Sequence, residues 1–377
     1  MNPPIYLDHN ATTPLLPEVV DAMLPFLHEH FGNPSSGHSF GQRTRQAIAH
    51  ARDQVAQLLG CDADELIFTS GGTEANNLAI RGGAEACPQR RHIVTTAIEH
   101  PATARPCLWL EQHGYTVSRL AVDTHGVTRL EQAAADVTDA TALVTAMHSN
   151  NETGALQPIQ DLAALAHAHG ALLHTDAAQS IGKVPVHVRS LDVDLLSIAG
   201  HKLYAPKGIG ALYIKRGTAL APFMLGAGHE HGLRPGTENV ASIVGLGVAC
   251  EVLGRDLKAS ATRLTILRDM LWHELAAAVP GLALNGHPDL RLPNTLNVRF
   301  PNSSGNRILA LAPDIAASTG SACHDGHDQA SAVIVAMGVA AIDALGSVRL
   351  TLGRSTSAAD IERASAAIIR AFHDSHG

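Results

Sequence analysis

Short apolar runs that end in polar residues recur through the first two thirds of the chain and predict buried strands. They lie at 66–69, 92–97, 143–147, 171–175, 194–198 and 211–214. Segments such as 40–60, 74–81 and 159–169 instead place apolar residues three and four positions apart, which predicts helices. Strands that are apolar on both faces and alternate with helices are typical of a parallel sheet covered on both sides. The pattern therefore predicts an α/β fold.

The last third of the chain has a different pattern. Helices at about 239–254 and 258–278 precede strands at 294–300 and 347–352 and a final helix at about 357–372. This mixture favours a smaller α+β domain. We place the boundary between the first two of these helices. The expected large domain is 15–256, and the expected small domain combines 1–14 with 257–377.

Polar side chains gather where the predicted strands end. The residues concerned are Thr73, His100, Asn151, Asp176, Gln179, His201 and Lys202. Open parallel sheets bind their ligands at the carboxyl ends of the strands. Their shared placement therefore predicts that these residues belong to one site.

Lys202 directly follows a buried strand and is the centre of this predicted site. A desolvated lysine has a lowered pKa and can attack a carbonyl as a nucleophilic amine. Asp176 ends another strand, and an amine beside a carboxylate is what pyridoxal phosphate requires, for a Schiff base and for the pyridinium nitrogen respectively. Taken alone, these two residues favour a structural ion pair over a cofactor site.

The turn at 70–73, with the sequence SGGT, lies between a predicted strand and a predicted helix. Free backbone N–H groups at such a helix start suit a phosphate group. The turn matches neither G-x-G-x-x-G nor G-x-x-x-x-G-K-[ST], so nucleotide binding is not indicated.

Composition narrows the class of protein. The 377 residues are 45% apolar and carry a net charge of −8, which gives no basic surface for nucleic acid. No run of 18 apolar residues and no N-terminal leader pattern is present, so we expect a cytoplasmic protein with no membrane association. The five cysteines show no C-x-x-C spacing, which favours reduced thiols.

The segment 317–327 is small, polar and rich in glycine, and it carries Cys323. A thiol in such a segment is expected to be accessible. Nearby His324 and His327 leave three interpretations open: a mobile loop, a metal site, or a reactive thiol on a movable arm. His229 and His231 lack the further ligands that a metal site needs, so we expect no metal.

Eleven motifs, in order from Tyr6 to Thr356, resemble those of the cysteine desulfurase family and its close relative selenocysteine lyase. They are YLDHNATTP, GNPSSGH, FTSGGTEANNLAI, IEHPA, NNETGALQPI, HTDAAQSIGKVP, GHKLYAPKGIGALY, RPGTEN, NTLNV, STGSAC and SVRLTLGRST. The resemblance spans nearly the whole chain. It implies a pyridoxal-phosphate enzyme of the aspartate-aminotransferase fold, with a large domain built on a mainly parallel sheet and a smaller α+β domain that carries the Cys323 loop.

The resemblance also implies a role for individual cofactor-binding residues. Lys202 would form the Schiff base, Asp176 would pair with the pyridine nitrogen, and His100 would stack on the ring and assist proton transfer. Gly72, Thr73 and His201 would hold the phosphate, Thr237 would reach it from a partner subunit, and Asn151 and Gln179 would lie beside the phenolic oxygen.

Three more residues would serve the substrate. Arg349 would clamp its carboxylate, Asn10 would line its pocket, and Cys323 would be the nucleophile that receives sulfur. The implied reaction converts L-cysteine to L-alanine and leaves a persulfide on Cys323 for delivery to an acceptor protein, in a homodimeric enzyme.

Two departures keep alternatives open. Ala199 stands where many desulfurases have a serine that bonds the phosphate, and His9 replaces the commoner asparagine. Both residues favour a selenocysteine lyase, which would use L-selenocysteine. The STGSAC motif instead favours a desulfurase. A degenerate, non-catalytic scaffold and another pyridoxal enzyme such as a transaminase are further alternatives.

Overall fold

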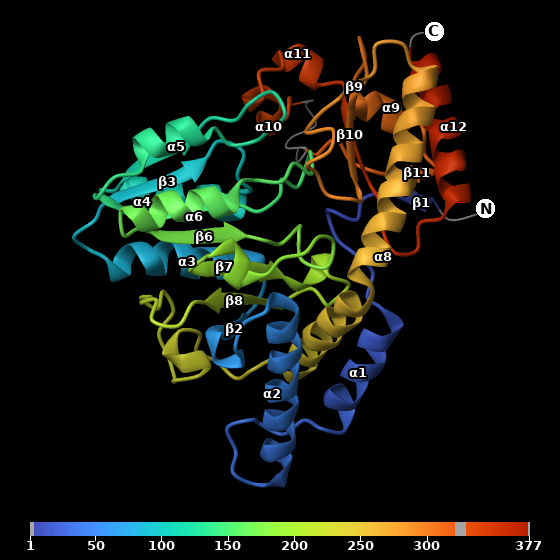
Figure 1. Cartoon of the computed structure of the whole chain (residues 1–377). Coiled ribbons are helices and arrows are strands. Elements are labelled where there is room, and N and C mark those ends of the chain that lie inside the picture. Colours follow the sequence, from blue (N-terminus) through green and yellow to red (C-terminus); the bar gives the residue numbers. More distant parts are fainter. Residues whose placement is uncertain (1–3, 321–328, 376–377) are drawn as a thin grey trace.

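The computed structural model describes residues 4–320 and 329–375, and strands alternate with helices along most of its length (Figure 1). The helices are α1 (Pro17–His28), α2 (Ser39–Leu59), α3 (Gly72–Ala86), α4 (Pro101–Gln112), α5 (Leu130–Asp136), α6 (Ile159–Ala168), α7 (Val188–Leu191), α8 (Val240–Ala278), α9 (Gly305–Leu311), α10 (Ala332–Ala336), α11 (Ala341–Ala344) and α12 (Ala358–Asp374). The strands are β1 (Ile5–Tyr6), β2 (Leu66–Thr69), β3 (His92–Thr96), β4 (Thr116–Leu120), β5 (Thr141–Met147), β6 (Leu172–Asp176), β7 (Leu195–Ala199), β8 (Gly210–Ile214), β9 (Ala283–Leu284), β10 (Thr295–Arg299), β11 (Ile315–Ala316) and β12 (Ser347–Thr351).

A seven-stranded sheet in the order β2-β8-β7-β6-β5-β3-β4 forms the centre of the fold. Neighbouring strands run parallel except at β8, which is antiparallel to both β2 and β7. The predicted α/β class with a mainly parallel sheet is therefore confirmed.

Both faces of this sheet are covered, as the apolar strands require. Along β7, Leu195 packs into a cluster with residues of α3 and α4, whereas Leu196 and Ile198 pack on the opposite face with residues of α2, α6 and α8. Successive side chains of a strand point to opposite faces, so an unbroken apolar run is buried on both. Because both faces are covered, a site can form only at the polar ends of the strands.

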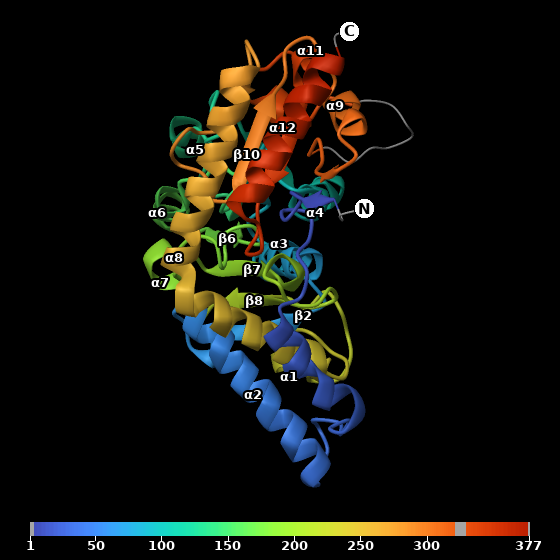
Figure 2. The same cartoon turned by 90° about the vertical axis from the view of Figure 1, so that its right-hand side faces the viewer.

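The C-terminal part forms a second, separate core (Figure 2). Strands β12, β10 and β9 make an antiparallel sheet, and β1 pairs with β11. Side chains of α8, α9 and α12 pack with them, among them Leu271, Ile308 and Ile368. The division into 15–256 and 1–14 with 257–377 stays a proposal, because another apolar cluster joins Ile98 and Met147 to Ile334 and Met337 across that boundary.

The expected boundary between two helices falls on a kink. The helices expected at 239–254 and 258–278 are the two parts of α8, which are joined where Asp256 departs from helical geometry (φ −127°, ψ 18°). Gly254 and Asp256 are weak helix formers, so the sequence around them resembles a helix end. Arg354 donates to both carboxylate oxygens of Asp256 at 2.9 and 2.8 Å, which supports the kink from outside the helix.

Candidate active site

A cavity lies at the carboxyl ends of the parallel strands, where open α/β sheets bind their ligands. It is lined by Gly72, Thr73, His100, Ala102, Met147, Ser149, Asn151, Asp176, Ala178, Gln179, Ala199, His201 and Lys202. All seven residues that we predicted from their places at strand ends are in this set. The fold thus brings together side chains that are up to 129 positions apart in sequence, from Thr73 to Lys202.

Lys202 and Asp176 reach the cavity from neighbouring strands. Lys202 ends a short 3₁₀ turn, Gly200–Lys202, that follows β7, and Asp176 is the last residue of β6. Burial lowers the pKa of the Lys202 amine, and the Asp176 carboxylate opposes that effect. No hydrogen bond joins Nζ of Lys202 to another described residue, so this amine is available to a bound carbonyl.

The Asp176 carboxylate is held by donors on both oxygens. Oδ2 accepts from Nδ2 of Asn76 at 2.7 Å, and Oδ1 accepts from the backbone N–H of Ala178 at 2.9 Å. These bonds fix the orientation of the carboxylate, so it can act as an oriented partner for a protonated ring nitrogen.

His100 is the N-cap of α4, and its ring is oriented by its own backbone. Nδ1 accepts from the backbone N–H of Ala102 at 3.1 Å, so the proton of the neutral ring is on Nε2. Burial, followed by the Lys202 charge, lowers the pKa of His100. His100 is therefore disposed to stay neutral and to exchange a proton through Nε2.

The start of α3 forms the end of the cavity that suits a phosphate group. Gly72 and Thr73 begin this helix, where free N–H groups and the helix dipole favour an anion. A Cβ at Gly72 would lie 3.1 Å from Cβ of Ala199, so the glycine allows the turn to approach β7 closely. His201 lines the same cavity, and burial lowers its pKa to about 4.

Gln179 supplies a further donor. Its Nε2 donates to the backbone oxygen of Asn10 at 2.9 Å, and its second N–H has no partner in the part of the chain that the structure describes. An available amine, an oriented carboxylate, an anion-binding helix start and a spare amide donor together fit pyridoxal phosphate. The residues present are thus compatible with the cofactor that the resemblance implies.

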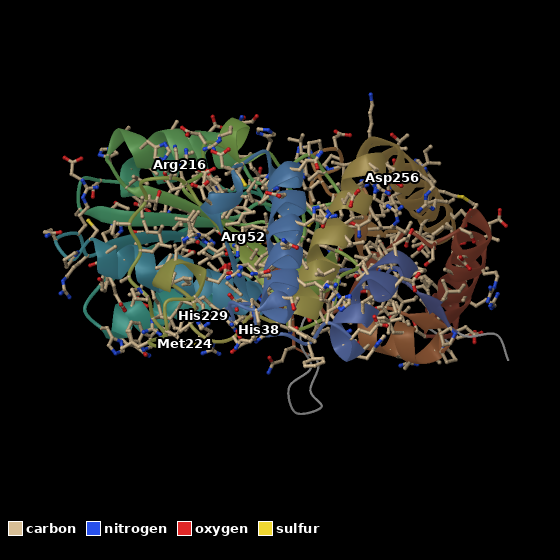
Figure 3. All side chains as sticks on the ribbon, turned by 90° about the horizontal axis from the view of Figure 1, so that it is seen from below. His38, Arg52, Arg216, Met224, His229 and Asp256 are labelled. Atoms are coloured by element: carbon tan, nitrogen blue, oxygen red, sulfur yellow. The ribbon has the colours of Figure 1, made fainter. Side chains whose placement is uncertain are left out.

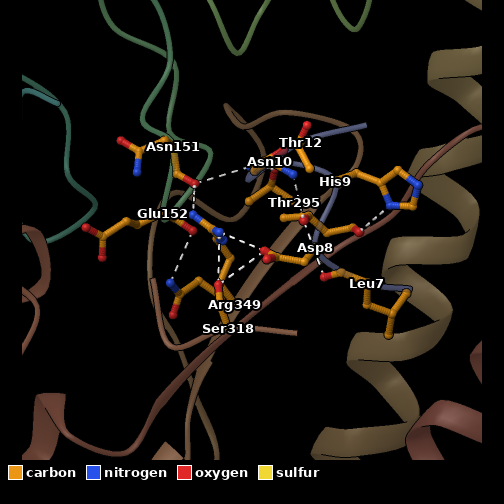
Figure 4. Close-up of polar contacts among 12 residues, drawn as sticks. Leu7, Asp8, His9, Asn10, Thr12, Asn151, Glu152, Thr295, Ser318 and Arg349 are labelled. Carbon is orange, nitrogen blue, oxygen red and sulfur yellow. Dashed lines mark hydrogen bonds and ion pairs between the residues drawn. The ribbon is translucent and has the colours of Figure 1, made fainter. Parts of the chain in front are cut away.

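Arg349 and Asn10 are not among the residues that line the cavity, but both contact one of them, Asn151 (Figure 4). Nη1 of Arg349 donates to the backbone oxygen of Asn151 at 3.0 Å, and Nδ2 of Asn10 donates to the same oxygen at 3.3 Å. Nδ2 of Asn10 also donates to Oγ1 of Thr295 at 2.9 Å. Both predicted substrate residues are therefore joined to the wall of the cavity, and their roles stay predictions.

Thr237 is set apart from the others. It is exposed and lines a separate hollow that also includes Ser70, in the loop that precedes α8. Arg234 in this loop pairs with Glu74 at 3.0 Å, and Glu74 accepts from the backbone N–H of Ser70. The loop is thus tied to the turn that begins α3, but Thr237 does not reach the cavity of its own chain. Cys323 lies outside the described residues.

Some lining residues were not predicted from the sequence. Ala102, Met147, Ser149 and Ala178 all line the cavity. Each lies within four positions of a predicted site residue, so proximity to a strand end was the available signal. Small or apolar side chains have no reactive or charged group that would indicate a site from the sequence.

Neither a metal-binding cluster nor a membrane-spanning helix occurs among the described residues. No group of three or more His, Cys, Asp or Glu side chains there is arranged to hold a metal ion. No helix among them is both long and apolar enough to cross a lipid bilayer.

Comparison with known proteins gives consistent matches over nearly the whole chain. The model of the family described as aminotransferase class-V matches residues 5–364. A cysteine desulfurase of Trichormus azollae is 46% identical over 361 residues, which cover 95% of this chain and 90% of that protein. A solved structure described as a NifS-like protein superposes with a TM-score of 0.93 at 34% identity, covering 98% of this chain and 100% of that one. One described as SspA in complex with cysteine has a TM-score of 0.82 at 34% identity, covering 92% and 98%.

Proposed function

The chain belongs to the aminotransferase class-V family and, within it, to the cysteine desulfurases, and on that premise we propose that it converts L-cysteine to L-alanine and passes the sulfur on as a persulfide. The observation that carries the proposal is the cavity that joins Lys202, Asp176 and His100. The relatives' names favour this activity over selenocysteine lyase and over a non-catalytic scaffold.

The chemistry divides between the cofactor and the chain. Bound pyridoxal phosphate supplies an electron sink for charge that develops at the substrate Cα. Lys202 would hold the cofactor and, once released by the substrate amine, would take the Cα proton. Asp176 would keep the pyridine nitrogen protonated, and His100 would stack on the ring and move a proton through Nε2.

The remaining cofactor contacts follow from position. Gly72, Thr73 and His201 would hold the phosphate, and Asn151 and Gln179 would lie beside the phenolic oxygen. Arg349 would bind the substrate carboxylate, because a guanidinium makes two parallel hydrogen bonds to that group. Asn10 would support the substrate pocket through Asn151.

Sulfur transfer would use Cys323, and this assignment rests on the sequence motif alone. The substrate Cβ–S bond breaks, and an S–S bond forms between that sulfur and Sγ of Cys323. The electron pair of the broken bond stays with the substrate carbon, which takes up a proton and leaves as the methyl group of alanine. An acceptor protein would then collect the outer sulfur.

A homodimer would complete the site, with Thr237 reaching the phosphate of the partner subunit. Exposed apolar side chains support a covered surface near α1 and the start of α2, namely Leu24, Leu27, Phe31, Phe40 and Leu225. Figure 3 shows the face that bears α2, with His38, Met224 and His229 labelled along one side. A cytoplasmic location would fit the four described cysteines, Cys61, Cys87, Cys107 and Cys250, which are all free thiols.

The test is to load the protein with pyridoxal phosphate and to measure alanine and sulfide formed from L-cysteine. We expect a visible absorption band and turnover, loss of the band in Lys202→Ala, and loss of sulfide release in Cys323→Ser. A visible band without alanine formation from L-cysteine would contradict the proposed activity, and equal sulfide release by Cys323→Ser would contradict the nucleophile.

A further inference from the structure

Lys183 is a buried lysine that the chemistry above does not use. Only 7% of its surface is exposed, and no acidic side chain pairs with it among the described residues. Its Nζ instead donates to Oε1 of Gln179 at 3.0 Å and to Oδ1 of Asn10 at 3.4 Å. Lysines are rarely buried without a carboxylate, so this arrangement calls for an explanation.

The two contacts of the Gln179 amide determine which way it faces. Gln179 lies four residues before Lys183 in the turn that follows β6, and it is 3% exposed. Its Nε2 donates to the backbone oxygen of Asn10, which can only accept, and its Oε1 accepts from Lys183. A side-chain amide has one donating and one accepting end, so both neighbours select the same orientation.

Without Lys183, only the bond to Asn10 would oppose a flip of this amide. A flipped amide would turn Oε1 toward the space that Nε2 now occupies, beside the cavity that Gln179 lines. An oxygen there would place two hydrogen-bond acceptors opposite each other, one from Gln179 and one from the bound group. Such a contact is unfavourable in a buried site.

We propose that Lys183 is a positioning residue that orients Gln179, so that an amide N–H rather than the amide oxygen meets the phenolic oxygen of bound pyridoxal phosphate. The inference rests on the proposed function, since that function supplies the acceptor. Burial lowers the pKa of Lys183 to about 7, which is consistent with an amine that serves as a donor in a site with no counter-charge.

The test follows the visible band of the cofactor-loaded enzyme as a function of pH. A donor on the phenolic oxygen stabilises its charged form, so losing the donor should raise the pH midpoint of the spectral change. We expect Lys183→Met, which keeps the length but removes the donor, to raise this midpoint by about one pH unit. The same substitution at the exposed Lys258 should leave it unchanged.

A double-variant cycle separates orientation from a direct effect of the Lys183 charge. In a Gln179→Leu background, Lys183→Met should shift the midpoint no further. An equal shift in both backgrounds, or no shift in the single variant, overturns the inference. Absence of any visible band in the wild type would instead overturn the proposed function.

A second variant covers the case in which Lys183→Met does not fold. Gln179→Glu places an oxygen where Nε2 now lies and keeps the shape of the side chain. We expect it to raise the midpoint and to weaken cofactor binding. An unchanged midpoint in a folded Gln179→Glu enzyme would also overturn the inference.

Discussion

The guanidinium of Arg349 is held by the carboxylate of Asp8, with Nη2 of Arg349 2.8 Å from Oδ1 of Asp8 (Figure 4). Ser318 completes the contact, because its Oγ accepts from Nη2 at 2.9 Å and donates to Asp8 at 3.2 Å. Nε of Arg349 is buried and has no partner among the described residues. The bonds to Asp8, Ser318 and Asn151 fix Arg349 and leave two of its five N–H groups, including the one on Nε, for a ligand.

Arg349→Lys is expected to weaken substrate binding selectively. A lysine cannot reproduce the planar fork that bonds Asp8, Asn151 and a carboxylate at once. We expect KM for L-cysteine to rise about 10- to 100-fold, with the visible cofactor band retained. The matched control is Arg354→Lys, which changes an arginine that pairs with Asp256 on α8. A KM within about twofold of wild type in Arg349→Lys would exclude the carboxylate clamp.

Ala199→Ser is expected to strengthen cofactor binding. Ala199 lines the cavity next to Gly72, where a hydroxyl could donate to the phosphate. A hydrogen bond to a charged group stabilises a complex enough to lower the dissociation constant of pyridoxal phosphate about tenfold. Titration of the cofactor-free protein, followed by absorbance, measures this constant. Unchanged or weaker binding would show that a side chain at 199 does not reach the phosphate.

Strand ends were predictable from the sequence because they combine an unbroken apolar run with polar residues that directly follow it. Asp176 and Lys202 could therefore be placed together before any contact was known. The same reasoning could not connect Asp8 with Arg349, which are 341 positions apart and meet through pairing of the N-terminal segment with β12. Pairing between distant strands is set by tertiary packing, which local patterns do not encode.

Lys183 shows a second limit of sequence reasoning. Its position on a polar turn after β6 gives no sign of burial, and only the structure reveals that its amine contacts Gln179 and Asn10. The kink in α8 at Asp256 was by contrast predictable, because Gly254 and Asp256 are weak helix formers that mark the boundary between the two expected helices.

Glu230→Ala is expected to destabilise the fold strongly. Oε1 and Oε2 of Glu230 accept from Arg52 at 2.6 and 3.0 Å, and Oε2 also accepts from the backbone N–H of Phe68 at 2.7 Å. The Glu230 side chain is 3% exposed, so its loss leaves a poorly solvated arginine, which costs about 3–5 kcal/mol. Urea unfolding of the cofactor-free protein measures the change.

Glu111→Ala is the matched control for the Glu230 variant. Glu111 also binds an arginine through both oxygens, at 3.1 and 2.7 Å to Arg119, but on the surface. Exposed pairs contribute little because water solvates both charges. We expect an almost unchanged urea midpoint in Glu111→Ala. Equal losses in the two variants would contradict the importance of burial at Glu230.

Glu99→Gln is expected to change how stability depends on pH. Burial raises the pKa of the Glu99 carboxyl from its ordinary 4.5 to about 8, although Oε1 accepts from Thr96 and from the backbone N–H of Met147. Between these two values the folded state holds a proton that the unfolded state has released. The free energy of unfolding of the wild type therefore falls as pH rises from about 4.5 to 8.

Glutamine keeps the accepting oxygen and cannot ionise. The free energy of unfolding of the variant should therefore not fall in this way as pH rises. The stability of Glu99→Gln relative to wild type should grow across that pH range, by a few kcal/mol in order of magnitude, and level off above it. Urea unfolding of both proteins at several pH values measures the difference. A difference that is constant from pH 5 to 9, as we expect for the exposed Glu111→Gln, would mean that the Glu99 carboxyl ionises normally in the fold.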